Sequence, residues 1–192
     1  MVPSTENAFT SIESQRLVLR RFTDADLVPF LAYLNDPFVA RYQSWDSYTE
    51  QQAREVIEKQ KNLDPGEPGR WFTFALELKE NGTLIGHVAL KMEDRQQAEV
   101  GFTLAREHHG HGLAFEAATA VLDYSFGKLE LHRVTAVTDC QNTRSAALLS
   151  RLGMRREGHF IQNIWFKGKW GDEYLYAILR EEWLRRRASE GS

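Results

Sequence analysis

The stretch that decides the fold is Ala98-Glu-Val-Gly-Phe-Thr-Leu-Ala-Arg-Glu-His-His-Gly-His-Gly-Leu-Ala114. Its pattern predicts a β-strand, then a loop with two glycines, then a helix over about 112–128. A helix that starts directly after such a loop presents unpaired backbone N–H groups, and its dipole adds to their attraction for an anion. Gly110 and Gly112 lack Cβ atoms, so the backbone can lie close to a phosphate. The spacing matches neither G-x-G-x-x-G nor G-x-x-x-x-G-K-[ST], so glycines that only shape the helix entry are an open alternative.

The same loop contains His108, His109 and His111, which invites comparison with a metal site. Neutral imidazoles bind zinc and nickel, but no cysteine or carboxylate at a recognised ligand spacing accompanies them. We therefore expect no metal. The single Cys140 excludes an intrachain disulfide, and we interpret it as a packed thiol because no neighbouring base would make it a nucleophile.

Strand and helix patterns alternate along the rest of the chain. Asn81-Gly82 between two apolar runs is a strong hairpin signal, and Thr49 followed by Gln52 has the spacing of a capping box. The expected strands are 16–20, 71–78, 84–91, 98–104, 133–138, 160–166 and 174–179, and the expected helices are 23–34, 49–62, 112–128, 143–152 and 181–187. This order predicts one mixed α/β domain over 15–187, with tails at 1–14 and 188–192.

Length and charge narrow the class of protein. A chain of 192 residues fits a single domain, and a net charge of −3 argues against a dedicated nucleic-acid binder. No apolar run reaches the length of a membrane span, and the polar start at 1–14 lacks a signal-peptide pattern. Together with the single cysteine, these features favour a cytoplasmic protein. The basic run Arg185–Arg187 is interpreted as the end of a last helix rather than as a phosphate-binding tail.

The segment His109-Gly-His-Gly-Leu-Ala114 resembles the Q/R-x-x-G-x-G/A motif of the GCN5-related N-acetyltransferase (GNAT) superfamily. Leu131–Val134, Asp139–Ala146 and Arg151–Gly158 are similar to the second half of the same family's domain. The resemblance runs from Arg16 to Trp183 and points to the branch that acetylates the N-termini of ribosomal proteins. It implies a single domain with a mixed, mainly antiparallel, twisted sheet flanked by helices.

The resemblance also implies acetyl-CoA as the acetyl donor, with no metal. Its pantetheine arm is expected along the strand end at Phe102, Thr103 and Leu104, with a hydrogen bond from Asn142. The residues expected at its pyrophosphate are His109, Gly110, His111, Gly112, Leu113, Ala114 and Phe115. His109 replaces the family's usual Gln or Arg, so we expect the backbone rather than this side chain to carry the phosphates.

The implied reaction is direct attack of an amine on the thioester, which needs a base, an oxyanion stabiliser and a proton donor for the leaving thiolate. Glu99 is the candidate base, acting through water; an ion-paired or solvated strand glutamate is the alternative. Many family members use a tyrosine as proton donor, but Leu149 stands at that position here. In the resembled branch a serine serves instead, and Ser145 matches it, with helix capping or packing as its alternative role. Val137 stands where one relative carries a glutamate base.

The acceptor site is expected between the link 38–48, the turn 93–97 and the hairpin near 165–170. Tyr42 and Trp45 are candidates for an apolar wall, although aromatic residues of this kind also pack links against sheets. The candidates for attracting an ammonium group are Asp46, Glu93 and Asp94.

Three hypotheses for the function follow. The first is the α-amine of a protein or peptide N-terminus. An α-amine has an ordinary pKa of about 7.7–8 and loses its proton more easily than lysine at about 10.4, which favours a peptide N-terminus or a small amine over a lysine side chain without deciding between them. The second hypothesis is a small amine, such as a polyamine, an amino acid or an aminoglycoside. The third is an acyl-CoA sensor without turnover, which Leu149 keeps open. The resemblance also admits a homodimer, although no residue of this sequence indicates one.

Overall fold

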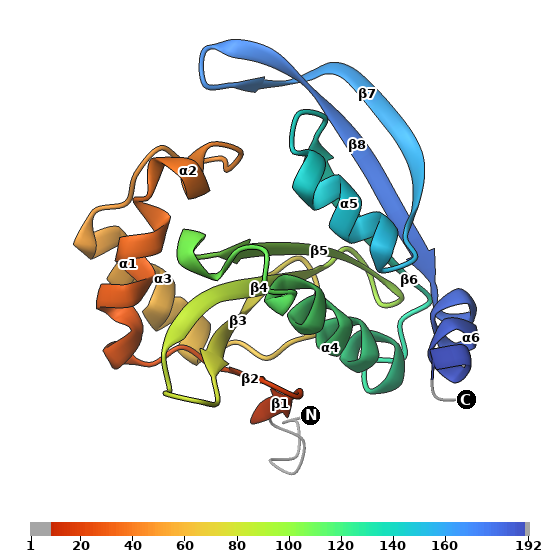
Figure 1. The fold of residues 1–192 in the computed structure, drawn as a ribbon, viewed down its shortest axis with the longest axis horizontal. Coiled ribbons are helices and arrows are strands. Elements are labelled where there is room, and N and C mark those ends of the chain that lie inside the picture. The colour runs from red at the N-terminus through yellow and green to blue at the C-terminus, as the bar shows by residue number, and fades with distance from the viewer. Residues whose placement is uncertain (1–8, 191–192) are drawn as a thin grey trace.

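The computed structural model describes residues 9–190 as one mixed sheet of eight strands with helices on both faces (Figure 1). The strands are β1 (Ser11–Glu13), β2 (Leu17–Arg20), β3 (Trp71–Leu78), β4 (Leu84–Met92), β5 (Gln97–Leu104), β6 (Arg133–Asp139), β7 (Arg155–Phe166) and β8 (Lys169–Leu179). The helices are α1 (Leu27–Leu34), α2 (Pro37–Ala40), α3 (Glu50–Lys61), α4 (Leu113–Gly127), α5 (Thr143–Arg151) and α6 (Arg180–Glu190). The expected α/β class and mainly antiparallel sheet are confirmed.

One strand pair interrupts the antiparallel order. The strands follow the order β1-β2-β3-β4-β5-β6-β8-β7, and β5 and β6 are parallel. Their register joins residues 97–99 to residues 133–135 and ends there. Beyond this point β5 and β6 continue without pairing to each other, over residues 100–104 and 136–139. We call the gap between these two stretches the β5–β6 opening.

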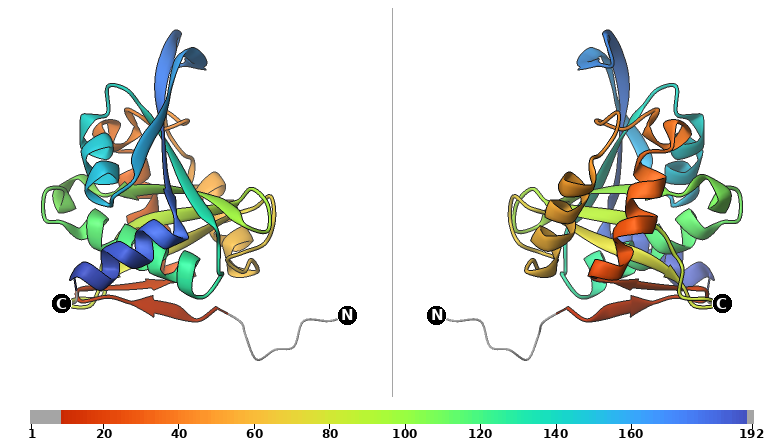
Figure 2. Two further views of the ribbon diagram at one scale, coloured as in Figure 1. Left: turned by 90° about the vertical axis from the view of Figure 1, so that its right-hand side faces the viewer. Right: turned by 90° about the vertical axis from the view of Figure 1, so that its left-hand side faces the viewer.

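Different helices cover the two faces of the sheet (Figure 2). On one face α4, α5 and α6 pack over the sheet, and Val100 of β5 belongs to the core beneath them. On the other face α1 and α3 pack over Ala75 of β3. Because side chains alternate along a strand, Glu99, Gly101 and Thr103 lie on the α1–α3 face. The β5–β6 opening therefore connects a face that carries α4 and α5 with a face that carries Glu99.

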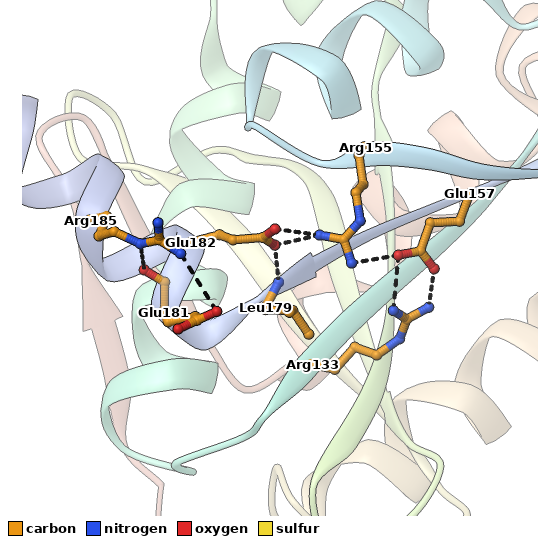
Figure 3. Close-up of polar contacts among 7 residues, drawn as sticks. All are labelled: Arg133, Arg155, Glu157, Leu179, Glu181, Glu182 and Arg185. Atoms are coloured by element: carbon orange, nitrogen blue, oxygen red, sulfur yellow. Dashed lines mark hydrogen bonds and ion pairs between the residues drawn. The ribbon is translucent and has the colours of Figure 1, made fainter.

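The long β7–β8 hairpin projects from the end of the sheet (Figures 1 and 2), and ion pairs fasten its base (Figure 3). Glu157 pairs with Arg133 of β6 and Arg155 of β7, each at 2.5 Å between nitrogen and oxygen. Arg155 also pairs with Glu182 of α6 at 2.5 Å, and Glu182 accepts a hydrogen bond from the Leu179 N–H. Exposed pairs contribute little individually, but these form a chain across three elements. The base of the hairpin is thus tied to both β6 and α6.

The hairpin is longer than the sequence predicts. β7 begins at Arg155 and β8 at Lys169, whereas strands were expected from 160 and 174. β7 is an edge strand with two register shifts and mostly exposed side chains, so its sequence lacks the alternation that identifies a half-buried strand. The first residues of β8 pair with β7 alone, so they too lack a buried face pattern.

Smaller differences occur elsewhere. Ser11–Glu13, in the expected N-terminal tail, pairs with β2, while residues 1–8 lie outside the described residues. α6 extends into the expected C-terminal tail, of which 191–192 lie outside. Pro37–Ala40 is helical where a link was expected, because Asp36 caps it by accepting from the Phe38 N–H at 2.7 Å. The other expected strands and helices are confirmed, with small shifts at their ends.

Within residues 9–190, no helix combines the length and the apolar character needed to cross a membrane.

Candidate active site

A cavity of about 610 Å³ lies at the β5–β6 opening and is lined from both faces of the sheet. Its walls come from the end of β5, the loop before α4, the starts of α4 and α5, and residues 37–48, which we call the α2 segment. Of the residues expected to hold a cofactor, all but His111 line this cavity. They are Phe102, Thr103, Leu104, His109, Gly110, Gly112, Leu113, Ala114, Phe115 and Asn142.

Gly110 and Gly112 shape the loop before α4. Both adopt left-handed conformations, with φ of +80° and +78°, which favour glycine. Gly112 is the N-cap of α4 and offers no capping side chain, so the N–H groups of the first helical turn remain free to bind an anion. A Cβ added at Gly110 would meet no atom within 4 Å, so the backbone there is openly accessible. Both roles considered for the glycines, turn geometry and close approach of a phosphate, fit this loop.

The side chains of His109 and Arg16 hold this loop in place through hydrogen bonds to main-chain carbonyls. The His109 ring bonds the Leu104 carbonyl through Nε2 at 2.9 Å; because a carbonyl only accepts, this nitrogen carries the proton. Arg16 donates from Nη1 to the His111 carbonyl at 3.0 Å and from Nε to Glu116 at 2.7 Å. His109 therefore ties the loop to the end of β5, and His111 is fixed through its backbone.

The free edge of β5 presents main-chain groups to the opening. Ala105 donates to the Ile85 carbonyl at 2.8 Å, and hydrogen-bonded pairs alternate along antiparallel strands. By this alternation Phe102 and Leu104 turn their N–H and C=O groups away from β4, toward the opening. Since His109 takes the Leu104 carbonyl, the N–H groups of both residues and the Phe102 carbonyl remain for an extended ligand.

The start of α5 faces these groups across the cavity. Asn142 is its N-cap, and its Oδ1 accepts from the Ser145 N–H at 3.2 Å. This cap uses the side-chain oxygen, so the amide nitrogen is the atom suited to donate to a ligand. Ser145 lines the cavity, as do Arg144 and Arg151. Arg151 holds its guanidinium 4.1 Å from the centre of the Phe115 ring. Cationic groups therefore line the same cavity as the loop before α4.

The cavity lining has neither the tyrosine that many family members place on α5 nor an acidic side chain. Leu149, at the position of the family's tyrosine, is 1% exposed and packs in the core. The cavity's lining residues include arginines and histidines but neither aspartate nor glutamate. Among described residues, Ser145 is therefore the hydroxyl on α5 that lines this cavity.

Glu99 lies at the point where β5 and β6 separate. It is paired with Thr135 of β6 at the last position before the opening and with Lys91 of β4 on its other side. Burial raises the pKa of Glu99 above its usual 4.5, and the carboxylates of Glu93 and Glu173 raise it further, while Lys91 opposes them. A carboxylate with a raised pKa is a stronger base.

The aromatic residues of the α2 segment divide into two roles. Trp45 donates from Nε1 to the Leu34 carbonyl at 3.1 Å and packs against the apolar residues between the sheet and helices α1 and α3. It therefore supports the α2 segment rather than forming an acceptor wall. Tyr42 lines the cavity and donates to the Gln141 carbonyl at 3.2 Å. Tyr42 thus joins the α2 segment to the loop after β6.

The tip of the β7–β8 hairpin holds the α2 segment through one side chain. Lys167 donates to the carbonyls of Ala40 at 2.8 Å and Trp45 at 3.0 Å, and it pairs with Asp46 at 2.9 Å. These three acceptors match the three donors of an ammonium group. Asp46 is therefore engaged within the protein.

The two acids expected in the turn before β5 differ in their partners. Glu93 pairs with Lys91 at 2.7 Å and lies close enough to Glu99 to affect its pKa. Asp94 accepts from the N–H groups of Gln96 and Gln97, so it shapes the turn.

Several site residues had no signal in the sequence. Gln43 donates to Thr103 Oγ1 at 3.2 Å, and Phe38 lies beneath the guanidinium groups of Arg106 and Arg144 at 4.8 and 5.4 Å. These contacts join positions far apart in the chain, where no motif or spacing identifies them. The α2 segment was expected near the acceptor, but its individual roles come from the fold.

The described residues do not gather the side chains that a metal site needs. Among residues 9–190, no group of three or more His, Cys, Asp or Glu side chains lies close enough to hold a metal ion. Burial is the main factor that raises the pKa of the half-exposed Cys140 thiol, which opposes formation of a thiolate.

Several known proteins are similar to this chain in sequence. A family model described as acetyltransferase (GNAT) domain matches residues 16–155. The uncharacterized N-acetyltransferase YnaD of Bacillus subtilis is 35% identical over 173 residues, covering 90% of this chain and 98% of that protein. The [ribosomal protein uS5]-alanine N-acetyltransferase of Escherichia coli is 34% identical over 84 residues, covering 44% of this chain and 43% of that protein.

Two solved structures extend the comparison. A GNAT-family acetyltransferase from Bacillus anthracis matches with a TM-score of 0.81 and 32% identity, covering 90% of this chain and 99% of that chain. The spermidine N-acetyltransferase of Vibrio cholerae in complex with CoA and spermine matches with a TM-score of 0.77 and 25% identity, covering 88% and 98%.

Proposed function

The chain belongs to the GNAT family of N-acetyltransferases, and we propose that it moves an acetyl group from acetyl-CoA to the α-amine of a protein or peptide N-terminus. One observation carries this proposal: a single cavity at the β5–β6 opening is lined both by the start of α4 and by the α2 segment, which lies on the face that carries Glu99. Acetyl-CoA supplies the acetyl group as a thioester, which an amine attacks directly.

The cavity's donor groups fit a long anionic ligand. The N–H groups at the start of α4 suit a pyrophosphate, and the open backbone at Gly110 leaves room for it. The free edge of β5 at Phe102 and the amide nitrogen of Asn142 suit a pantetheine arm. Arg144 and Arg151 add positive charge for the remaining phosphate.

Glu99 supplies the base in this proposal. Its raised pKa brings the carboxylate closer to the pKa of an α-amine than an ordinary glutamate. A water molecule between Glu99 and the amine would pass the proton, because Glu99 lies beside the cavity rather than among its lining residues.

Ser145 is the proposed proton donor to the leaving thiolate. It lines the cavity at the start of α5, and its N–H is already bound by the Asn142 cap, so the hydroxyl is held near the cavity wall. A hydroxyl can donate one hydrogen bond to sulfur. Leu149, one turn further, cannot replace it.

An α-amine has an ordinary pKa of about 7.7–8, so it gives up its proton to a base more easily than a lysine side chain at about 10.4, and this favours an α-amine over a lysine as the acceptor. The matched uS5-alanine N-acetyltransferase acts on such an α-amine according to its name. A small-amine acceptor is the second candidate, because Glu93 and Glu173 add negative charge beside Glu99 and the spermidine N-acetyltransferase shares the fold.

Calorimetric titration with acetyl-CoA, with NAD and ATP as controls, tests the donor. Thiol release then tests the acceptor with three amines: a short peptide with a free N-terminus, the same peptide blocked at its N-terminus but carrying a free lysine, and spermidine. We expect micromolar binding of acetyl-CoA alone and turnover of the free peptide. Preference for spermidine would select the small-amine alternative, and binding without turnover would select a sensor. A folded protein that does not bind acetyl-CoA would overturn the proposal.

A further inference from the structure

Strand β5 carries a glycine that neither its backbone nor its packing requires. Gly101 does not adopt a left-handed conformation, and a Cβ added there would meet no heavy atom within 4 Å. Glycine weakens a strand interior, and in such positions it often marks a place where a ligand approaches the backbone. This explanation does not apply to Gly86 of the neighbouring strand, whose Cβ would lie 2.2 Å from the Thr103 carbonyl.

Gly101 occupies a specific place in the site. It lies on the α1–α3 face between Glu99 and Thr103, and it is the first residue on that face after β5 separates from β6. On one side stands the candidate base; on the other, Thr103 is bound by Gln43 of the α2 segment. The missing side chain therefore leaves a gap in the sheet face directly beside Glu99.

The opposite side of the opening is apolar and accessible. Val137 of β6 follows Thr135 on the same face and is 36% exposed, although most strand residues of its type are buried. It pairs with Leu175 of β8. The gap at Gly101 thus has a carboxylate at one end, a hydroxyl at the other and an apolar wall across from it.

We infer that the gap over Gly101 is the subsite through which the primary amine of the acceptor and its first carbon reach the donor, with the water that serves Glu99. This inference rests on the proposed function. A methyl group at position 101 would occupy the path of the amine, and an isopropyl group would fill it. The donor lies along the main chain of β5 at Phe102 and Leu104, so the same substitutions leave its site intact.

Gly101→Ala and Gly101→Val test this subsite. We expect both variants to fold, because the backbone conformation is ordinary, an added Cβ meets open space, and alanine and valine suit a strand at least as well as glycine. Gly127→Ala is the matched control, since that glycine also has an ordinary φ and open space but lies at the end of α4. Melting temperature and acetyl-CoA affinity are measured beside turnover of the accepted amine.

We expect all three variants to bind acetyl-CoA as the wild type does. Gly101→Ala should lower kcat/KM for the amine roughly tenfold, as one added methyl does in a fitted pocket. Gly101→Val should lower it about 100-fold or more, because the amine is displaced from its line of attack. Gly127→Ala should leave kcat/KM unchanged.

Two results would overturn the inference while leaving the proposed function standing. One is wild-type kcat/KM in Gly101→Val; the other is a loss of acetyl-CoA affinity in both Gly101 variants, which would place the gap on the donor. A wild-type protein that acetylates no amine would instead remove the proposed function and the inference together. Gly101→Ala keeps the test decisive if valine proves too large for the strand.

Discussion

The donor side and the acceptor side of the site are built in different ways. On the donor side, the strand end, the glycine loop and the start of α4 come from one continuous stretch, 98–115, and His109 binds a carbonyl only five residues earlier. On the acceptor side, the contacts join Gln43 to Thr103 and Lys167 to Ala40, which are 60 and 127 positions apart. The donor side therefore takes most of its shape from local sequence, with Arg16 and the start of α5 as its distant supports, whereas the acceptor side depends throughout on how distant elements pack.

This difference fits the separate tasks of the two sides. A donor shared between relatives needs a binding loop of constant shape, and a local motif provides one. An acceptor that differs between relatives needs walls that can change without disturbing that loop. The α2 segment contacts β5 through Gln43 and the loop after β6 through Tyr42, and the hairpin tip contacts the α2 segment through Lys167.

Glu99→Gln should separate the two sides most strongly. Removing the base should lower kcat by about 10²–10⁴ while acetyl-CoA affinity stays the same, because the carboxylate lies on the acceptor face. In the wild type, kcat/KM should fall as pH drops through the raised pKa of Glu99. The measurement is kcat/KM against pH, with calorimetry for acetyl-CoA. Equal turnover in wild type and variant would remove Glu99 as the base.

The same variant also has an expected effect on stability. Because the folded state raises the pKa of Glu99, ionising this group opposes folding at pH values above its ordinary 4.5. Glu99→Gln should therefore have a higher free energy of unfolding than wild type at neutral pH, and the difference should vanish as pH falls below that value. Urea unfolding at several pH values measures it. A variant that is less stable at neutral pH would contradict the direction of this pKa shift.

Gly86→Ala tests the support that both sides share. A Cβ at Gly86 would lie 2.2 Å from the Thr103 carbonyl oxygen and 2.8 Å from the Leu104 Cα, and backbone atoms cannot move aside cheaply. We expect a loss of about 2–4 kcal/mol in the free energy of unfolding, with weaker binding of donor and acceptor together. Gly82→Ala is the control, since Gly82 has φ of +70° but open space, so it reports the conformational cost alone, about 1 kcal/mol. Equal losses in both variants would show that the close contact has no effect.

The sequence predicts the two sides to different extents. Gly110 and Gly112 can be interpreted locally, because glycines directly before a helix indicate either turn geometry or close approach of a ligand, and in the structure both adopt the left-handed conformation that favours glycine. Trp45 was a candidate acceptor wall, but its indole binds the Leu34 carbonyl, which only the packing of α1 against the α2 segment determines. Lys167 had no signal at all, since its partners lie more than 120 positions away.

Gly112→Ala should affect the donor side alone. A methyl group at the N-cap of α4 would stand where the phosphate approaches, and φ of +78° adds strain. We expect the Kd for acetyl-CoA to rise roughly tenfold to 100-fold. The KM for the amine, measured at saturating acetyl-CoA, should not change. Gly82→Ala shares the left-handed conformation away from the cavity, so unchanged affinity in that variant shows that backbone strain alone is not the cause.

Lys167→Met should have the smallest effect, confined to the acceptor side. The thioether side chain keeps much of the length of lysine but cannot donate to the carbonyls of Ala40 and Trp45 or pair with Asp46, so the α2 segment loses its contact with the hairpin tip. We expect the KM for the amine to change by about three- to tenfold, since two or three partly exposed polar contacts are lost, with acetyl-CoA affinity unaffected. Lys169→Met, an exposed lysine of the same hairpin, is the matched control. A shift of equal size in both variants would mean that charge near the site, rather than the position of the α2 segment, sets the KM.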